Sequence, residues 1–549
     1  MYNWYGDIIS ETDANGEIYQ YAYDKLARLT KVTNPDLSAQ EYSYDVGYAV
    51  NDVTAKDENG NIIKTSYDNY GRVIAERDVT NNVLLSEHSR EDIDYEFIWQ
   101  DVVYSTQTGK TTTRTHYNGL GQQTEKEVLD ANGNVLYHEL TDRDYGVDGM
   151  LSKVITTVYG ETDEADVKNI QYTDIYGNVV KEEVVYNENG ASKSAVTEYT
   201  YDYVGNVKTL REPRAYDEGW SASEYTAKYE YDAFGNVTKE TDINNKSIVN
   251  TYDGMGNLVS VKDKDGNVTT NTYDVIGRLI KEQVPFQKNG LKTVYAENKY
   301  YYDANGNVIK SQTANNAVGS GTTYTTTEYQ YNWQNRPTKV KGFNGNEVES
   351  CVQYYYDSVG NVLRMYTGDV DDLVINGLDN VSGSNDYAVT KYAYDSMNRC
   401  ISQTDALGQT VTNTYDINGN LISATDRNGN TLSYSYDGLN QLLSKSSSKT
   451  TADTYTYSYN MKGNRTGMTG GGVDTTSVYD NLGRLTKESL TNGTVKEYTY
   501  DINGNRKSFK LTKDNAVQYT LTYDYDKLNR LTKVYEDGNE KAEYEYNDD

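Results

Sequence analysis

The chain has 549 residues, of which 57 are tyrosine but only five are phenylalanine, four tryptophan and four proline, and its formal net charge is −30. Such an acidic chain is a poor ligand for nucleic acid, because phosphate contacts need clustered lysine and arginine. Few aliphatic residues with a high net charge are typical of intrinsic disorder. Tyrosine rings, however, bury large apolar areas while their hydroxyls stay hydrated. We therefore predict a folded chain with a tyrosine-rich core.

Segments that would direct the chain to a membrane are not found in the sequence. There is no apolar run of 18 residues, and residues 1–11 lack the pattern of a secretion signal. We therefore expect no membrane span and no signal sequence within this chain. The two cysteines, Cys351 and Cys400, cannot build a disulfide framework; a single bridge between them and two separate thiols both remain open.

A short repeat begins near the N-terminus and continues through the chain. Its template is seen in Tyr229-Glu-Tyr-Asp-Ala-Phe-Gly-Asn236 and in Tyr498-Thr-Tyr-Asp-Ile-Asn-Gly-Asn505. From Tyr394 onward the copies are 21, 21, 23, 20, 21, 25 and 21 residues apart. Such a period indicates a repeat architecture rather than several independent cores. In chain order, the second tyrosine of the copies is Tyr23, Tyr44, Tyr67, Tyr117, Tyr172, Tyr201, Tyr231, Tyr252, Tyr273, Tyr302, Tyr331, Tyr356, Tyr394, Tyr415, Tyr436, Tyr459, Tyr479, Tyr500, Tyr525 and Tyr546.

A second, weaker turn lies between these copies, so each unit holds two turns and two strands. Tyrosines two apart before the first turn, such as Tyr199 and Tyr201, place both rings on one face of a strand. The pattern predicts short antiparallel hairpins whose tyrosines pack on one face of a sheet. The second turn is seen at Asp13–Gly16, Asp57–Gly60, Asp130–Gly133, Asp263–Gly266, Asp405–Gly408 and Asp426–Gly429.

The chemistry of the first turn accounts for its composition. An aspartate carboxylate can accept backbone N–H bonds across the turn, and the glycine or asparagine three residues later tolerates positive φ. The strand resumes at once, often with Arg-Leu. The residues expected to build the repeat include Tyr201, Asp202, Gly205, Tyr231, Asp232, Gly235, Tyr273, Asp274, Gly277, Arg278, Tyr415, Asp416, Gly419, Tyr479, Asp480, Gly483, Arg484, Tyr500, Asp501 and Gly504.

We predict an all-β fold in which residues 1–549 form a single continuous repeat domain, a long antiparallel sheet of hairpins. Scarce proline fits this prediction, because strand interiors need their N–H groups. Residues from about 81 to 168 have irregular spacing and hold all three histidines, His88, His116 and His138. The segment from about 367 to 386 is an acidic insertion that we expect to be an exposed loop.

The Tyr-Asp-x-x-Gly-Arg-Leu pattern at Tyr273–Leu279 and Tyr479–Leu485 resembles the YD repeat of the Rhs family. This family includes bacterial Rhs polymorphic toxins, wall-associated proteins, shell subunits of Tc toxins and animal teneurins. The resemblance extends over essentially the whole chain. It implies a β-sheet strip that spirals into a hollow shell or a partial, barrel-like wall, and in many bacterial members this shell encloses a toxic C-terminal region.

The chain departs from that family pattern near its end. Shell members typically close with a core segment that contains an Arg-Tyr-Tyr-Asp-Pro-like run and aspartates that cleave the toxin free. No such run is present, so self-cleavage is assigned to no aspartate of this chain. Because the repeats run up to both ends, we expect a segment of a longer polypeptide whose toxin or effector region is absent here.

Other chemistries compete with this structural interpretation. Paired carboxylates could serve a glycosidase, but the aspartates recur at turns, where backbone capping accounts for them. The histidines lack ligand spacing in the sequence, so we assign them neither a catalytic nor a zinc role. We expect no cofactor. Calcium is the alternative, with Asp369, Asp371 and Asp372 in the acidic insertion as candidate ligands, but a solvated loop is the default interpretation of the same residues.

The leading hypothesis is a structural shell segment of a secreted or cell-surface bacterial protein. It would encapsulate or present a cargo or toxin polypeptide, without enzyme activity. The alternative is an adhesin-like module that binds glycans or a partner protein, because tyrosine rings can stack on sugars while neighbouring aspartates bind hydroxyls.

Overall fold

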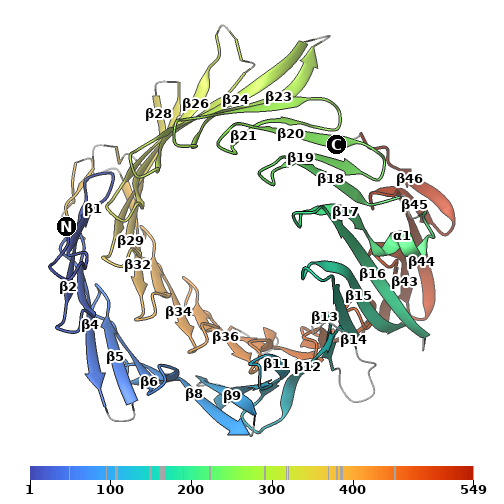
Figure 1. Ribbon diagram of the computed structural model, residues 1–549, viewed down its shortest axis with the longest axis horizontal. Coiled ribbons are helices and arrows are strands. Elements are labelled where there is room, and N and C mark those ends of the chain that lie inside the picture. The colour runs from blue at the N-terminus through green and yellow to red at the C-terminus, as the bar shows by residue number, and fades with distance from the viewer. Residues whose placement is uncertain are drawn as a thin grey trace. The chain divides into compact units, whose positions relative to one another are not determined.

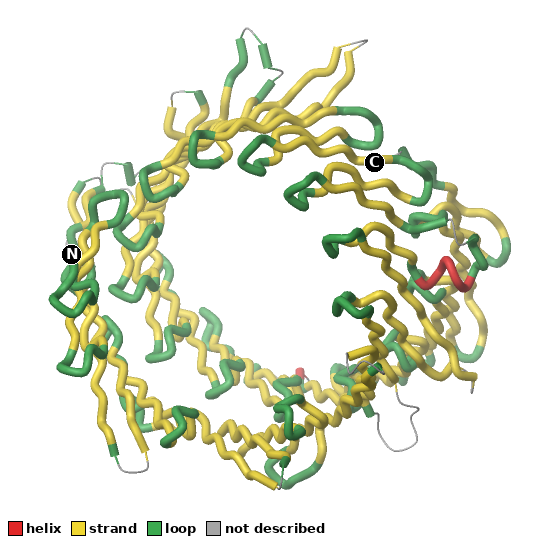
Figure 2. Tube along the Cα trace, in the orientation of Figure 1, coloured by secondary structure: helices red, strands yellow, loops and turns green. Residues whose placement is uncertain are grey.

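The computed structural model describes most of the chain, and almost all of its regular structure is strand. Figure 2 shows the strands in yellow and the connecting turns in green. The single helix of the described part is α1 (Pro213–Asp217), which is one short turn. The described residues are 1–47, 50–93, 95–105, 109–146, 151–159, 167–188, 191–221, 224–289, 292–316, 318–319, 321–345, 347–368, 370–371, 373–378, 381–383, 387–449 and 453–547.

The strands gather into two compact units. The first comprises residues 1–89, 102–104 and 268–431, and the second comprises residues 90–101, 105–267 and 432–549. Strands β8 (Val83–Ile93), β9 (Glu96–Ser105) and β36 (Thr431–Tyr436) have residues in both units.

The first unit contains 21 further strands. They are β1 (Ser10–Thr12), β2 (Ile18–Tyr23), β3 (Leu29–Thr33), β4 (Ala39–Val46), β5 (Val50–Lys56), β6 (Ile62–Asp68), β7 (Val73–Asp78), β22 (Val268–Tyr273), β23 (Leu279–Asn289), β24 (Lys292–Tyr302), β25 (Val308–Ala314), β26 (Tyr324–Tyr331), β27 (Pro337–Asn344), β28 (Glu347–Tyr356), β29 (Val362–Gly368), β30 (Val374–Ile375), β31 (Val381–Ser382), β32 (Tyr387–Tyr394), β33 (Cys400–Thr404), β34 (Thr410–Tyr415) and β35 (Leu421–Thr425).

The second unit contains α1 and 22 further strands. They are β10 (Gly109–Tyr117), β11 (Gln123–Leu129), β12 (Val135–Tyr145), β13 (Leu151–Val158), β14 (Val167–Thr173), β15 (Val179–Glu188), β16 (Ala191–Tyr201), β17 (Val207–Arg211), β18 (Ala227–Tyr231), β19 (Val237–Asp242), β20 (Ser247–Tyr252), β21 (Leu258–Lys262), β37 (Leu442–Ser447), β38 (Tyr455–Tyr459), β39 (Arg465–Gly470), β40 (Thr475–Tyr479), β41 (Leu485–Leu490), β42 (Thr494–Tyr500), β43 (Arg506–Lys513), β44 (Ala516–Tyr525), β45 (Leu531–Glu536) and β46 (Asn539–Glu543).

Sheet pairing follows the order of the sequence. Of the described strands, 44 belong to one sheet, and β30 and β31 pair separately. Within a unit each strand pairs antiparallel with the next, as β2 does with β3 and β3 with β4. Strand β29 instead pairs with β32, so residues between them form an excursion from the sheet. The predicted all-β architecture of antiparallel hairpins is therefore confirmed, and it extends through the described residues of the irregular stretch 81–168.

Tyrosines form the covered face of the strands. Along β2, Tyr19, Tyr21 and Tyr23 are half-buried, whereas the residues between them are exposed. The same alternation runs through Tyr455–Tyr459 in β38. Because side chains alternate between the two faces of a strand, one face carries the rings and the other faces solvent.

The acidic insertion, predicted to be an exposed loop, is buried in part: Val374 and Leu378 are exposed, but Val370 and Leu373 are not. Val370 is 0% and Leu373 4% exposed, and both pack with Tyr366 and Cys351 in a buried cluster. The reason is that apolar residues lie between the acidic ones, and these apolar side chains pack against the covered face of β28 and β29. Cys351 is buried and Cys400 half-buried, and no disulfide joins them, so of the two alternatives left open by the sequence the structure has two separate thiols.

Within each unit, two stretches of repeats that are distant in sequence lie side by side. In the first unit β1–β7 run beside β25–β33 (Figure 1), and Asn15 Nδ2 donates to Asp303 Oδ2 at 3.0 Å across 288 residues. Asn59 likewise donates to Asp357 at 2.8 Å across 298 residues. In the second unit the Arg214 N–H donates to Asn503 Oδ1 at 2.9 Å across 289 residues.

The two stretches of repeats that lie side by side in a unit, or strips, meet through different kinds of turn. Asn15 and Asn59 lie in the weaker turns of their strip, whereas Asp303 and Asp357 open Tyr-Asp turns of the other. The edge lined by Tyr-Asp turns in one strip is therefore covered by the opposite edge of its neighbour.

Most Tyr-Asp turns of the described residues are tight turns beside a bulge, whereas at Tyr44-Asp45 the pairing of β4 with β5 continues through Val46 without a register shift. At Asp253–Gly256 the Gly256 N–H donates to the Asp253 carbonyl at 3.1 Å, and Gly256 has φ +84°. The strand register shifts just before the turn, between Thr251 and Tyr252. A glycine in the left-handed region beside such a shift is characteristic of a G1 bulge.

We predict that Gly256→Val destabilises the protein by about 1–3 kcal/mol, because a β-branched residue is strained at this φ. Gly254, in the same turn, provides the matched control. Both glycines have open space where a Cβ would lie, but only Gly256 has the left-handed conformation. Chemical denaturation of both variants measures the difference, and equal losses would contradict the turn assignment.

Candidate functional site

The aspartate of each Tyr-Asp turn holds the turn together through its carboxylate. Asp202 Oδ1 accepts the N–H groups of Val204 at 3.0 Å and Asn206 at 2.9 Å, and its Oδ2 accepts the Asn206 side chain at 3.0 Å. Gly205 follows with φ +95°. The same arrangement holds Asp232 with Gly235, Asp274 with Gly277, Asp416 with Gly419, Asp480 with Gly483 and Asp501 with Gly504.

These hydrogen bonds favour the charged carboxylate. At Asp253 the Asn257 side-chain amide is the main cause of a lowered pKa, and the backbone N–H groups add to it. At Asp274 the leading cause is the Arg278 backbone N–H, followed by its guanidinium. The turn aspartates are thus committed to the backbone, which agrees with the capping role predicted for them.

The tyrosine before each aspartate links one hairpin to the previous one. The paired ladder between β15 and β16 ends at Lys181 and Glu198, and beyond it the Tyr201 hydroxyl donates to the Val179 carbonyl at 2.6 Å. Tyr500 reaches Leu485 in the same way, at 2.8 Å. In each case the acceptor is the first residue of the strand that leaves the preceding Tyr-Asp turn.

The same bond recurs along both units. It joins Tyr44 to Leu29, Tyr231 to Val207, Tyr252 to Val237, Tyr302 to Leu279, Tyr331 to Val308, Tyr356 to Pro337, Tyr394 to Val362, Tyr415 to Cys400, Tyr459 to Leu442, Tyr479 to Arg465, Tyr525 to Arg506 and Tyr546 to Leu531. Partial burial raises the pKa of several of these phenols, including Tyr231 and Tyr302. The rings therefore stay protonated donors at neutral pH. Tyr273 ends β22 directly before the Asp274 turn.

The arginine of the Gly-Arg-Leu sequence joins its own turn to the next one. Arg278 Nε donates to Asp274 Oδ2 at 2.7 Å, and its Nη1 donates to the Asp303 carbonyl of the next turn at 2.8 Å. The guanidinium lies 4.7 Å from the centre of the Tyr302 ring. Such stacking suits the planar cation.

Arg484 repeats this arrangement with Asp480, the Asp501 carbonyl and the Tyr500 ring. Sequence reasoning identified Arg278 and Arg484 as repeat residues but assigned them no partner. The distance along the chain from each arginine to its partner differs, being 25 residues for Arg278 and 17 for Arg484, so spacing alone did not reveal the contact.

The calcium ligands predicted in the acidic insertion are only partly described. Asp369 and Asp372 lie outside the described residues. Asp371 forms ion pairs with Lys341 and, at 3.7 Å, with Lys339. The Lys341 ammonium is the main cause that lowers the pKa of Asp371. A carboxylate already neutralised by two lysines is a weak calcium ligand, so calcium binding stays an untested alternative to the solvated loop.

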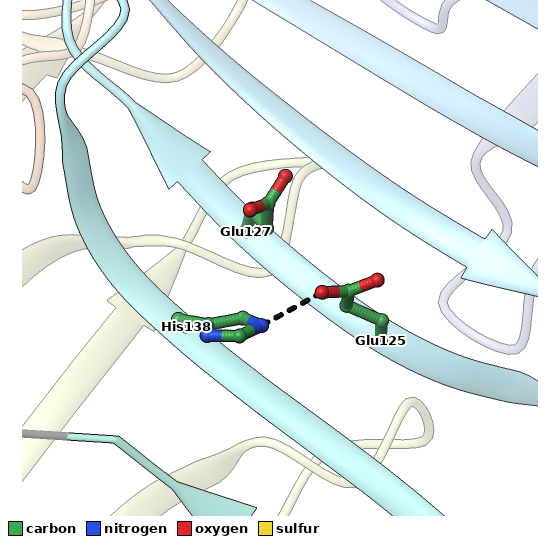
Figure 3. A group of neighbouring side chains, drawn as sticks. All are labelled: Glu125, Glu127 and His138. Atoms are coloured by element: carbon green, nitrogen blue, oxygen red, sulfur yellow. Dashed lines mark hydrogen bonds and ion pairs between the residues drawn. The ribbon is translucent and has the colours of Figure 1, made fainter.

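The sheet brings together residues that the sequence keeps apart. Glu125 lies on β11 between His116 of β10 and His138 of β12. Figure 3 shows Glu125, Glu127 and His138, in which the Glu125 carboxylate is 2.7 Å from His138 Nε2. His88 lies elsewhere, with its Nε2 3.0 Å from the Ser86 hydroxyl. Antiparallel pairing of β10, β11 and β12 produces this cluster, which the spacing of the histidines does not reveal. Among the described residues, no helix is long and apolar enough to span a membrane.

We predict that Tyr500→Phe lowers the free energy of unfolding by about 1 kcal/mol, because it removes one partly buried hydrogen bond and keeps the ring. Tyr203→Phe is the matched control, because the Tyr203 side chain is 99% exposed at a turn tip. Urea denaturation compares the two variants. Similar stabilities for both would show that the bond to Leu485 contributes nothing.

Comparisons with known proteins support the repeat. The RHS repeat model matches residues 2–39 and 415–453. The comparison with curated proteins gave no match.

Solved structures of Tc toxins share the fold. The chain is similar to a Photorhabdus luminescens Tc holotoxin pore structure, with 12% identity over 96% of this chain and 36% of that one, at a TM-score of 0.55. It is similar to the crystal structure of TcdB2-TccC3-Cdc42, with 14% identity over 96% and 34% of the two chains and a TM-score of 0.57. The crystal structure of TcdB2-TccC3 without its hypervariable C-terminal region is similar with 14% identity over 96% of this chain and 35% of that one, at a TM-score of 0.51.

This chain spans about a third of the length of those chains. At such low identities the likeness concerns the fold alone. The family match identifies RHS repeats at residues 2–39 and 415–453, and the repeated Tyr-Asp-x-x-Gly turns between them follow the same pattern.

Proposed function

We propose that this chain is a wall segment of a YD-repeat shell that encloses or presents another polypeptide. The observation that carries the proposal is the interlock between successive turns. Tyr201, Tyr500 and their equivalents bond each hairpin to the one before it. A sheet fixed in this way at every repeat is suited to forming a continuous barrier.

Contacts between neighbouring strips support the same role. Asn305 donates to Asp13 at 2.7 Å while Asn15 donates to Asp303 at 3.0 Å, so the two turns bond reciprocally. In the second unit Arg214 donates to the Asp526 carbonyl at 2.6 Å and Lys527 pairs with Glu224 at 2.6 Å. Polar contacts of this kind hold neighbouring strips together without a thick hydrophobic core between them.

Containment requires no catalytic group, and we propose a non-catalytic role. We further propose that the protein acts outside the bacterial cell or at its surface, with a polypeptide cargo as its partner. The similarity to TcdB2-TccC3, including a form without its hypervariable C-terminal region, supports a polypeptide partner.

A protease-protection assay tests the enclosure. An unstructured reporter segment is attached after the last residue of the full chain, and the same segment attached before Met1 is the control. We expect proteinase K to cut the C-terminal reporter at least several times more slowly than the N-terminal one, because a wall excludes the protease. Equal cleavage rates would argue against enclosure by this segment.

Glycan binding is the second candidate, and a hollow in the second unit favours it. The hollow lies between the turns at Asp202–Asn206 and Asp232–Asn236. The rings of Tyr203, Tyr229 and Phe234 line it beside polar groups. Aromatic faces next to carboxylates suit the apolar and polar faces of a sugar.

A glycan array with the full chain tests this candidate. If the hollow binds sugars, Tyr203→Ala and Phe234→Ala should remove the signal. Tyr176→Ala is the control, because Tyr176 is an equally exposed ring at another turn and does not line the hollow. Absence of any hit, or an equal loss in the control, would reject glycan binding at this place.

A further inference from the structure

Two of the three histidines in this chain meet at one place in the second unit. His116 lies on β10, Glu125 and Glu127 on β11, and His138 on β12. The register places His116 directly opposite Glu125, and Glu127 directly opposite His138. Because directly opposed residues share a face of the sheet, all four side chains project on the same side.

The potential ligand atoms are close enough for one ion. One carboxylate oxygen of Glu125, one of Glu127 and a ring nitrogen of His138 all lie within 4.8 Å of one another. His138 Nε2 is 2.7 Å from Glu125 Oε1, and His116 Nε2 is 3.9 Å from Glu125 Oε2. Ligands around a tetrahedral zinc ion are roughly 3.3 Å apart, given bonds of about 2 Å. Glu125, Glu127 and His138 are therefore close enough to share one ion, whereas His116 lies outside this group and approaches it only through Glu125.

The surroundings hold these groups in place without sealing them off. The His138 ring stacks on Tyr159, with centroids 4.6 Å apart and planes inclined by 16°. The side chains of His116, Glu125 and His138 are 33%, 28% and 25% exposed, so a hydrated ion can reach them. Arg114 lies opposite Glu127 on β10, so it is the neighbouring cation with which a metal ion would compete for that carboxylate.

We propose that Glu125, Glu127 and His138, together with the adjacent His116, bind a divalent transition-metal ion of the zinc type. Two imidazoles with two carboxylates suit zinc and its neighbours in the first transition row, whereas calcium and magnesium prefer oxygen ligands only. The ion would tie β10, β11 and β12 together at the stretch where the spacing of the repeats is least regular. It would act as a structural link rather than as a catalytic centre.

Calorimetric titration of the full chain with Zn²⁺ tests the proposal, with excess Ca²⁺ present to occupy non-specific carboxylates. We expect one saturable site. His138→Gln and Glu125→Gln should weaken binding by about 10-fold or more, because each removes a ligand or its closest partner. His88→Gln is the matched control and should leave binding unchanged, since His88 lies far from the cluster in sequence and bonds to Ser86.

A spectroscopic titration with Co²⁺ gives a second readout. Binding through imidazole should produce visible absorption bands that are lost in the His138 variant and retained in the His88 variant. If His138→Gln fails to fold, His116→Gln replaces it, because His116 is the more exposed of the two rings. Zinc binding that disappears in excess Ca²⁺, or that is unaffected in the cluster variants, would overturn the proposal.

Discussion

The bond from a tyrosine hydroxyl to the first carbonyl of the previous repeat is the interaction on which this structure depends. A sheet of short hairpins has almost no closed interior, and few apolar side chains of the described residues are fully buried. Each hairpin must therefore be fixed to its neighbour at the edge. Tyrosine does this with one side chain, since its ring covers the sheet and its hydroxyl satisfies a backbone acceptor. Phenylalanine would supply only the ring, which explains why the chain has 57 tyrosines and five phenylalanines.

The aspartate and the residue four positions later determine how strongly one turn is joined to the next. Where that residue is asparagine, as at Asn206, its amide returns to the aspartate of its own turn. Where it is arginine, as at Arg278, the side chain also reaches the carbonyl of the next turn and stacks on the next tyrosine. The repeats are thus similar in shape, but some make more contacts with the next repeat than others do. A sheet built from them is held together more strongly at some positions along its length than at others.

Contacts between strips hold neighbouring parts of the sheet together, in addition to the contacts between successive hairpins. The edge lined by Tyr-Asp turns in one strip receives the weaker turns of the other, as when Asn59 bonds Asp357. In contrast, the Tyr-Asp turns at Tyr203 and Phe234 have exposed tips and border the hollow considered for glycans. One kind of turn therefore serves both as an internal joint and as an exposed surface, depending on whether a strip covers it. The proposed metal site lies in the irregular stretch and would strengthen the sheet where the regular spacing is lost.

The strands, the turns and the repeat could be predicted from the sequence, because alternation of side chains, capping aspartates and left-handed glycines are local properties. Asp202 and Gly205 could be predicted in this way. Partners that depend on register or on long sequence separation could not be predicted. The link from Tyr201 to Val179, the bonds between strips such as Asn15 to Asp303, and the meeting of His116 and His138 at Glu125 all depend on which strands adjoin. The acidic insertion shows the same limit, since composition suggested an exposed loop while Val370 and Leu373 are buried against Tyr366. These contacts exist only in the folded chain, because neighbours in space are fixed by the pairing of strands and not by the spacing of residues along the chain.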